Sequence, residues 1–145
     1  MTDAVKELLI QASPSTIFPY LTDPSKFVLW MGTDVTIVAA PGGEFRALCG
    51  GVNPSAGTFL QVVPDQKVVF TFGWDLPDHP IPAGSTTVEI TLTPEGDATI
   101  VRLVHSGLPD DAISDHLLGW TYYLGRLDAV LSGADPGPDR ALLAR

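Results

Sequence analysis

The stretch from Asp110 to Ser132 limits the folds open to this chain more than any other part of the sequence. Asp110 or Asp111 can cap the start of a helix, and Gly133 followed by Pro136 marks its end. A helix with one apolar face must pack against another apolar surface, which we expect to be a curved sheet. The large apolar side chains recur at alternating steps of four and three, as on one face of an α-helix, at Ile113, Leu117, Trp120, Leu124, Leu127 and Leu131.

Length and charge restrict the class of protein further. The 145 residues fit one domain, predicted to span 1–133, followed by a tail at 134–145 that we expect to be loosely attached. No apolar run is long enough for a membrane span and no signal sequence is present, so we expect a soluble cytoplasmic protein without membrane contact. The net charge of −9 and the scattered basic residues argue against binding to nucleic acid.

The segments before the long helix predict a strand, two short helices and then further strands. Residues 5–10 form an apolar extended segment, and Ser13 and Asp23 each precede a proline, which is typical of a helix start. Pro19 is expected to distort the first of these helices. From residue 33 to residue 106, apolar runs alternate with turns, including 53–57 and the proline-rich loop 75–84, which predicts an antiparallel meander.

Alternation of side chains along the predicted strands assigns one face of the sheet to the core. We expect Arg102 to face solvent. The side chains expected to face the long helix are Val68, Phe70, Phe72, Trp74, Val88, Ile90, Leu92, Val101, Leu103 and His105.

The order and spacing of several segments resemble the SRPBCC or START-like superfamily, and within it the family named for the activator of heat-shock protein 90 ATPase. The segments are ASPSTIFPYLTDPSKFVLWMG, PGGEFRA, GTFLQVVPDQKVVFTFGW, LVHSGLP and HLLGWTYYLGRLDAVL. The resemblance implies an α+β helix-grip fold of START or Bet v-like type. In this fold a curved antiparallel sheet of about six to seven strands wraps around the C-terminal helix and encloses a deep apolar cavity.

The same resemblance bears on function. Members of the superfamily bind lipids, sterols, polyketides or plant hormones, and some catalyse cyclisation or dehydration. The co-chaperone that names the family has an additional N-terminal domain that contacts the chaperone. This sequence begins directly at the first strand, so we do not expect chaperone contact.

The aromatic residues are the main candidates for a ligand site. We expect them to enclose an apolar, lipid-, polyketide- or aromatic-type ligand between the helix and the sheet. A filled core explains the same pattern, because rings at strand and helix spacing usually pack together. A void near Trp120 would separate the two interpretations. The candidate ligand-binding residues are Trp30, Phe45, Phe59, Phe70, Phe72, Trp74, His105, Trp120, Tyr123 and Leu124.

Polar candidates are fewer, and we assign no catalytic residue. His105 is expected on the covered face, where His116 and Tyr123 can join it, although an inward histidine is more often a hydrogen-bonded core residue. Arg46 either forms a surface ion pair with Glu44 or points into the cavity to hold a ligand carboxylate. An enzyme of cyclase, dehydratase or hydrolase type would use His105, Tyr123 or Arg46 as proton donors.

Other site chemistry has little support in the sequence. No metal, nucleotide or nucleophile motif occurs, and the histidines at 79, 105 and 116 lack ligand spacing, so we expect no metal and no cofactor. Cys49 is expected to be a small buried apolar residue, and loop 75–84 with His79 is either a gate or a plain connection. A partner-binding module, such as a homodimer or a co-chaperone-like adaptor, remains the third interpretation.

Overall fold

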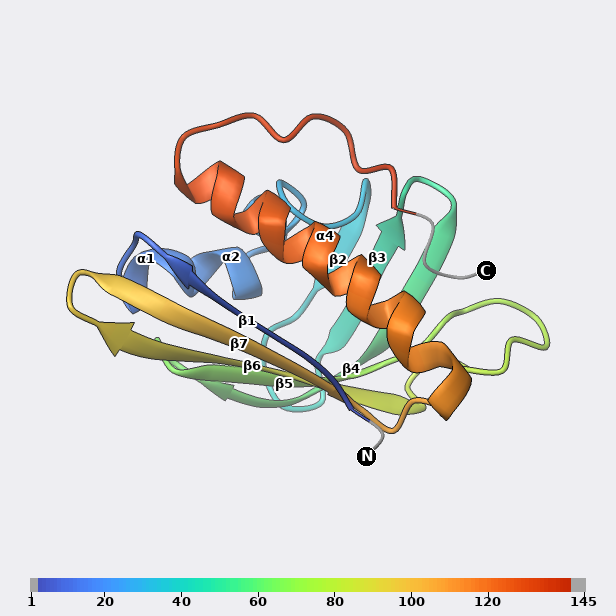
Figure 1. The fold of residues 1–145 in the computed structure, drawn as a ribbon. Coiled ribbons are helices and arrows are strands. Elements are labelled where there is room, and N and C mark those ends of the chain that lie inside the picture. The colour runs from blue at the N-terminus through green and yellow to red at the C-terminus, as the bar shows by residue number, and fades with distance from the viewer. Residues whose placement is uncertain (1–2, 142–145) are drawn as a thin grey trace.

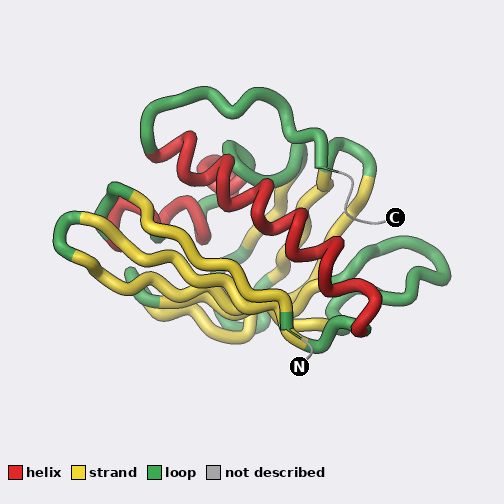
Figure 2. Tube along the Cα trace, viewed as in Figure 1, coloured by secondary structure: helices red, strands yellow, loops and turns green. Residues whose placement is uncertain are grey.

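The computed structural model describes residues 3–141 and consists of a seven-stranded antiparallel sheet with one long helix lying across it (Figure 1). Figure 2 shows the same two layers coloured by type of element. The strand order is β1-β7-β6-β5-β4-β3-β2, so the first and last strands pair with each other. The elements are β1 (Ala4–Ile10), α1 (Pro14–Ile17), α2 (Pro19–Thr22), α3 (Pro24–Phe27), β2 (Val35–Ile37), β3 (Glu44–Cys49), β4 (Asn53–Val63), β5 (Lys67–Phe72), β6 (Thr86–Glu95), β7 (Ala98–Ser106), η1 (Asp110–Ala112) and α4 (Ile113–Leu131).

The long helix α4 confirms the apolar face that the sequence predicts, but it begins differently. Trp120, Leu124 and Leu127 are buried against the sheet. The expected cap is wrong, because no aspartate side chain caps the helix, and residues 110–112 instead coil into the tighter turn η1. The helix itself therefore starts at Ile113.

Three single-turn helices follow β1, where the sequence predicts two. Ser13 and Asp23 cap α1 and α3 through side-chain oxygens, as expected. Pro19 does more than distort the first predicted helix: it starts a separate turn, α2, since its ring has no N–H to continue the ladder of α1.

The sheet faces are confirmed by register and burial. Val88 pairs with Phe70 on β5 and with His105 on β7, and all three side chains lie under α4. Arg102 is exposed on the opposite face. The core therefore occupies the space between α4 and one side of the sheet. No helix among residues 3–141 is long and apolar enough to cross a bilayer.

Two loops differ from a simple meander. The predicted turn at 53–57 is wrong, because these residues form the first half of β4 and pair with β3, Pro54 lying opposite Leu48. The loop 75–84 is irregular, as predicted, and is joined to the sheet by isolated bridges from Trp74 to Pro82 and to Ser55.

The tail is packed against the domain over residues 134–141, here called the C-terminal strap. In Figure 1 the red chain after α4 turns back along the helix toward the turn between β3 and β4. Gly50 in that turn has a φ of +62°, and a Cβ there would lie 2.0 Å from the carbonyl oxygen of Ala141, so only glycine permits this approach. The expectation of loose attachment is thus corrected for the strap, while Leu142 and Leu143 lie outside the described residues.

Candidate functional site

All ten candidate ligand residues are buried between α4 and the covered face of the sheet. None is more than 1% exposed. We call this set the aromatic core, and it brings together residues from seven places in the chain. Trp30 follows α3, Phe45 is on β3, Phe59 on β4, Phe70 and Phe72 on β5, Trp74 just after β5, His105 on β7, and Trp120, Tyr123 and Leu124 on α4.

The rings of the aromatic core pack directly against one another. Phe45 and Phe70 stack with ring centroids 4.3 Å apart. Phe72 lies 5.3 Å from Trp74 and 5.6 Å from Trp120, which joins the sheet rings to the helix. Spacings of this size are ordinary for tilted and edge-on aromatic pairs. The candidate residues therefore meet in one continuous cluster.

Two histidines and two tryptophans form a buried hydrogen-bonded network at the start of α4, here called the imidazole network. The Trp74 indole N–H donates to His116 Nε2 at 3.2 Å, and the Trp120 indole N–H donates to His105 Nδ1 at 2.9 Å. The two imidazole rings lie edge to face at 5.4 Å. The expectation that His116 joins His105 in a polar cluster is confirmed by this geometry.

The indole donors fix the protonation state of both imidazoles. An indole nitrogen can only donate, so each histidine must accept at one nitrogen and donate at the other. His116 Nδ1 then donates to the Ala112 carbonyl at 2.9 Å. His105 Nε2 donates to Thr86 Oγ1 at 2.8 Å, and that hydroxyl donates to the Phe72 carbonyl. Both rings are therefore neutral, in opposite tautomers.

Burial reinforces the neutral state. Loss of contact with water, together with a smaller effect of the neighbouring His116, lowers the pKa of His105 to about 3. Burial also lowers the pKa of His116, although Asp115 and the Ala112 carbonyl act in the opposite direction. At neutral pH the imidazole network thus offers polar atoms without a charge.

A hollow of about 130 Å³ leads from the surface to the imidazole network. We call it the mouth hollow. Loop 75–84 forms one wall, and the start of α4 forms the other. His116 is the most buried of its polar lining residues and is only 3% exposed. The lining residues are His79, Pro80, Ile81, Asp111, Ala112, Asp115 and His116.

Tyr123 does not join the imidazole network, so that expectation is wrong, and it belongs to a different polar group. Its hydroxyl donates to Asp139 Oδ2 at 2.8 Å. Burial, together with Cys49 and Asp139, raises the pKa of Tyr123 far above its ordinary range. Burial likewise raises the pKa of the Cys49 thiol to about 11. The expectation for Cys49 is confirmed in that it is fully buried.

Arg126 is buried on α4, and its side chain binds main-chain carbonyls of the C-terminal strap. Its Nε donates to the Trp30 carbonyl at 2.9 Å. One terminal nitrogen donates to the carbonyls of Pro136, Gly137 and Pro138 at 3.2, 3.0 and 3.4 Å. Within residues 3–141, no carboxylate lies within 4.0 Å of this guanidinium.

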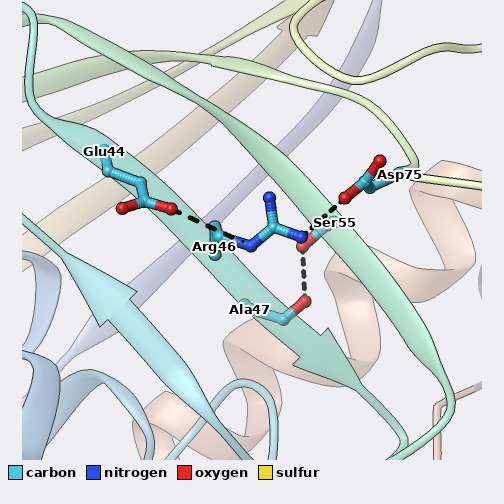
Figure 3. Close-up of polar contacts among 5 residues, drawn as sticks. All are labelled: Glu44, Arg46, Ala47, Ser55 and Asp75. Atoms are coloured by element: carbon cyan, nitrogen blue, oxygen red, sulfur yellow. Dashed lines mark hydrogen bonds and ion pairs between the residues drawn. The ribbon is translucent and has the colours of Figure 1, made fainter.

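Arg46 lies on the surface, so the ion-pair interpretation is confirmed and the cavity interpretation is wrong. Figure 3 shows its guanidinium between Glu44 and Asp75, with nitrogen–oxygen distances of 3.9 and 2.6 Å. The side chain is 42% exposed. Residues two apart on a strand share a face, and here that face is turned away from the aromatic core.

The three proton donors named for an enzyme therefore do not assemble. His105 lies in the imidazole network, Tyr123 binds Asp139 and Arg46 is on the surface. No group of three or more His, Cys, Asp or Glu in the described part of the chain is arranged to hold a metal ion.

Three residues that organise these polar contacts are absent from the predicted site, and only two of them have a weak signal in the sequence. Thr86 precedes the inward residue Val88 by two positions, so alternation places it on the covered face. Arg126 lies three residues after Tyr123 and one before Leu127, within the buried stripe of the helix. Asp139 has no such signal. Two of its donors are backbone amides, and a backbone amide does not depend on the type of residue that carries it.

Comparison with known proteins identifies relatives of the same architecture. Residues 11–132 match the model of the family described as Activator of Hsp90 ATPase homolog 1-like protein. An AHSA1-like protein from Rhizobium etli, solved by NMR, is 38% identical, covers 97% of this chain and 88% of its own, and superposes with a TM-score of 0.71. No curated protein matches this chain.

Two more distant structures share the fold. DynU16, from the dynemicin biosynthetic locus, is 21% identical over 94% of this chain with a TM-score of 0.81, and the match covers 49% of DynU16, about half its length. The Aha1 dimer from Colwellia psychrerythraea is 21% identical, with coverage of 90% and 96% and a TM-score of 0.77. Since the family match spans most of the sequence and α4 lies across the sheet in the helix-grip arrangement, this chain belongs to the Activator of Hsp90 ATPase homolog 1-like family.

Proposed function

We propose that this protein binds an apolar small molecule between α4 and the sheet, and that the ligand enters through the mouth hollow. The observation that carries the proposal is the position of this hollow. It ends at His116, which binds Trp74 and lies against His105, so it leads to the part of the aromatic core under the start of α4. Apolar walls with a few placed polar atoms are typical of small-molecule sites.

The chemistry of the imidazole network favours a ligand without charge at this end. Both histidines are neutral at pH 7 and accept hydrogen bonds from the indole N–H groups of Trp74 and Trp120, so the network presents no formal charge to a ligand. Aromatic or polyketide-type molecules have broad apolar faces and no charge at such a position. Catalysis has less support, because the ring nitrogens that would move a proton are already paired within the protein.

Binding requires the mouth hollow to widen. Its volume of about 130 Å³ is below the roughly 300 Å³ at which small-molecule sites begin. Loop 75–84 is the wall that can move, because it is irregular and contacts the sheet through few main-chain hydrogen bonds, such as Trp74 N–H to the Ile81 carbonyl at 2.8 Å. The start of α4 is held by its own helical ladder.

Tryptophan fluorescence tests the proposal directly. Trp74 and Trp120 border the proposed path, so an apolar ligand is expected to change the emission and raise the melting temperature. The panel comprises fatty acids, sterols and aromatic polyketides, and native mass spectrometry of protein from its own host shows any molecule that is carried through purification.

Two matched variants locate the site. Ala112→Phe places a ring in the mouth hollow, whereas Thr121→Phe places the same ring on the exposed face of α4. Binding is expected to be lost in Ala112→Phe and kept in Thr121→Phe. A clean apo mass with no response to the whole panel would refute ligand binding, and equal binding by both variants would refute the route.

A further inference from the structure

One carboxylate oxygen of Asp139 in the C-terminal strap is held by donors that do not belong to the strap, whereas the other accepts from the Ala141 amide within the strap at 2.9 Å. Its Oδ2 accepts from the amide of Gly32 at 2.8 Å, from the amide of Gly50 at 3.1 Å and from the hydroxyl of Tyr123 at 2.8 Å. We call these three groups the donor cluster. They come from the turn after α3, the turn after β3, and α4. Three donors from separate elements thus converge on one carboxylate oxygen.

The donor cluster needs an acceptor. The Tyr123 side chain is fully buried, and buried donors that lack a partner are strongly destabilising. Gly32 and Gly50 have φ values of +84° and +62°, and these backbone conformations belong to the turns themselves. The geometry that receives a carboxylate is therefore built into the domain before the strap is added.

A groove of about 540 Å³ adjoins the donor cluster, between the strap, α4 and the segment after α3. Gly32 and Asp139 both line it, so the groove reaches the cluster. Its other walls combine apolar side chains, Val28, Leu29 and Val130, with the guanidinium of Arg126. Leu29 is 47% exposed, so its apolar side chain is accessible from the groove.

The charges of the groove depend on the strap. Asp135 and Asp139 line it, but both belong to the strap and would leave with it. Arg126 would remain, and it would lose the three strap carbonyls to which it donates. Without the strap, the fixed part of the groove therefore has a positive charge, an apolar wall and the donor cluster.

We propose that the donor cluster is a carboxylate-binding site, that Asp139 occupies it as an internal substitute, and that an apolar carboxylic acid replaces Asp139 there. The ligand carboxylate takes the three hydrogen bonds of the donor cluster, and Arg126 gives the same groove a positive charge without contacting the carboxylate directly. The apolar part lies along the groove and against the aromatic core at Tyr123. This inference rests on the proposed function and adds to it the head group of the ligand and a second contact point.

Chemical rescue tests the donor cluster. Asp139→Ala removes the internal carboxylate and leaves the three donors in place. Acetate, compared with chloride at equal ionic strength and pH 7, is expected to raise the melting temperature of this variant by about 3 °C more than that of the wild type. Acetamide, which has the same shape without the charge, is expected to give no such rise.

Two further variants control for general effects. Asp139→Asn fills the same space, so it is expected to show no more dependence on acetate than the wild type. Asp139→Ala combined with Tyr123→Phe lacks one donor, and its rescue by acetate is expected to be smaller. An equal response to acetate in the wild type and in Asp139→Ala would overturn the proposal.

A second measurement covers the case in which Asp139→Ala fails to fold. In the wild type, octanoate is expected to shift the NMR resonances of the Gly32 and Gly50 amides, and octanol is not. Unchanged resonances with octanoate would overturn the proposal. Acetate rescue needs no apolar ligand and reports on Tyr123, whereas the test of the proposed function reports on Trp74 and Trp120, so either can fail without the other.

Discussion

His105 is expected to make this protein markedly less stable in mild acid. Its imidazole is fully buried, and its nitrogens are occupied by Trp120 and Thr86. The pKa is about 3 in the folded state, against an ordinary value of 6.5. Between these two values the unfolded chain binds more protons than the folded one. The stability that neutral His105 provides is therefore complete above pH 6.5 and is lost as the pH falls toward about 3.

The size of the effect follows from the two pKa values. Each pH unit below the unfolded pKa removes about 1.4 kcal/mol, so lowering the pH from 7 to 5 reduces the free energy of unfolding by roughly 2 kcal/mol through His105 alone. His116 acts in the same direction, because burial lowers its pKa too. A loss of this size is a large part of the stability of an ordinary domain.

Urea unfolding at pH 7 and pH 5 measures this loss. His105→Gln keeps an acceptor and a donor at the ring position but cannot titrate, so its loss between the two pH values is expected to be smaller by roughly 2 kcal/mol. Val88→Ala, which opens a cavity beside the same histidine, should lose as much as the wild type. If His105→Gln and the wild type lose equal free energy, the assignment of a depressed pKa to His105 is refuted.

Three further predictions concern other parts of the molecule. Cys49, with a pKa of about 11 and no exposed surface, should not react with a thiol reagent at pH 8 until urea unfolds the protein, and native reactivity would contradict its burial. Gly125→Ala, at an exposed position of α4 with nothing within 4 Å of the added Cβ, should stabilise the protein by about 1 kcal/mol. Gly57→Ala should be strongly destabilising, because its Cβ would lie 1.8 Å from a carbonyl oxygen of the next strand, and equal thermal shifts of the two variants would contradict this difference in space. Arg46→Ala should cost at most about 1 kcal/mol of unfolding free energy in urea, and less in 1 M salt; a larger, salt-independent loss would mean that Arg46 is not a surface residue.

The fold could be predicted because its main signals are periodic and local. The apolar stripe of α4 and the alternation along β6 each repeat over many residues, so errors at single positions cancel. The errors occurred where one residue decides the local structure. Pro19 divides the predicted helix into two. Pro54 lies inside strand β4, although the residues around it predict a turn.

The candidate site could be predicted only in part, for a different reason. Burial of the aromatic core follows from hydrophobicity and, for His105, from strand alternation, so the burial of all ten candidate residues could be predicted; their contact with a ligand stays a prediction. The hydrogen bonds within it join residues far apart in the chain, such as Trp74 and His116, and their pairing depends on the final packing. Asp139 was missed because its partners at Gly32 and Gly50 are main-chain amides, which every residue except proline possesses.

The pairing of β1 with β7 sets the order in which the protein can be completed during synthesis. Ala4 lies opposite His105, so about a hundred residues must be made before the first strand finds its partner. At the usual speed of translation this takes on the order of 5–20 s. During that time β1 leaves the ribosome as an unpaired strand, with Val5 and Leu9 on one side and Ile10 on the other. The last strand to be synthesised is thus the one that gives the first a place in the sheet.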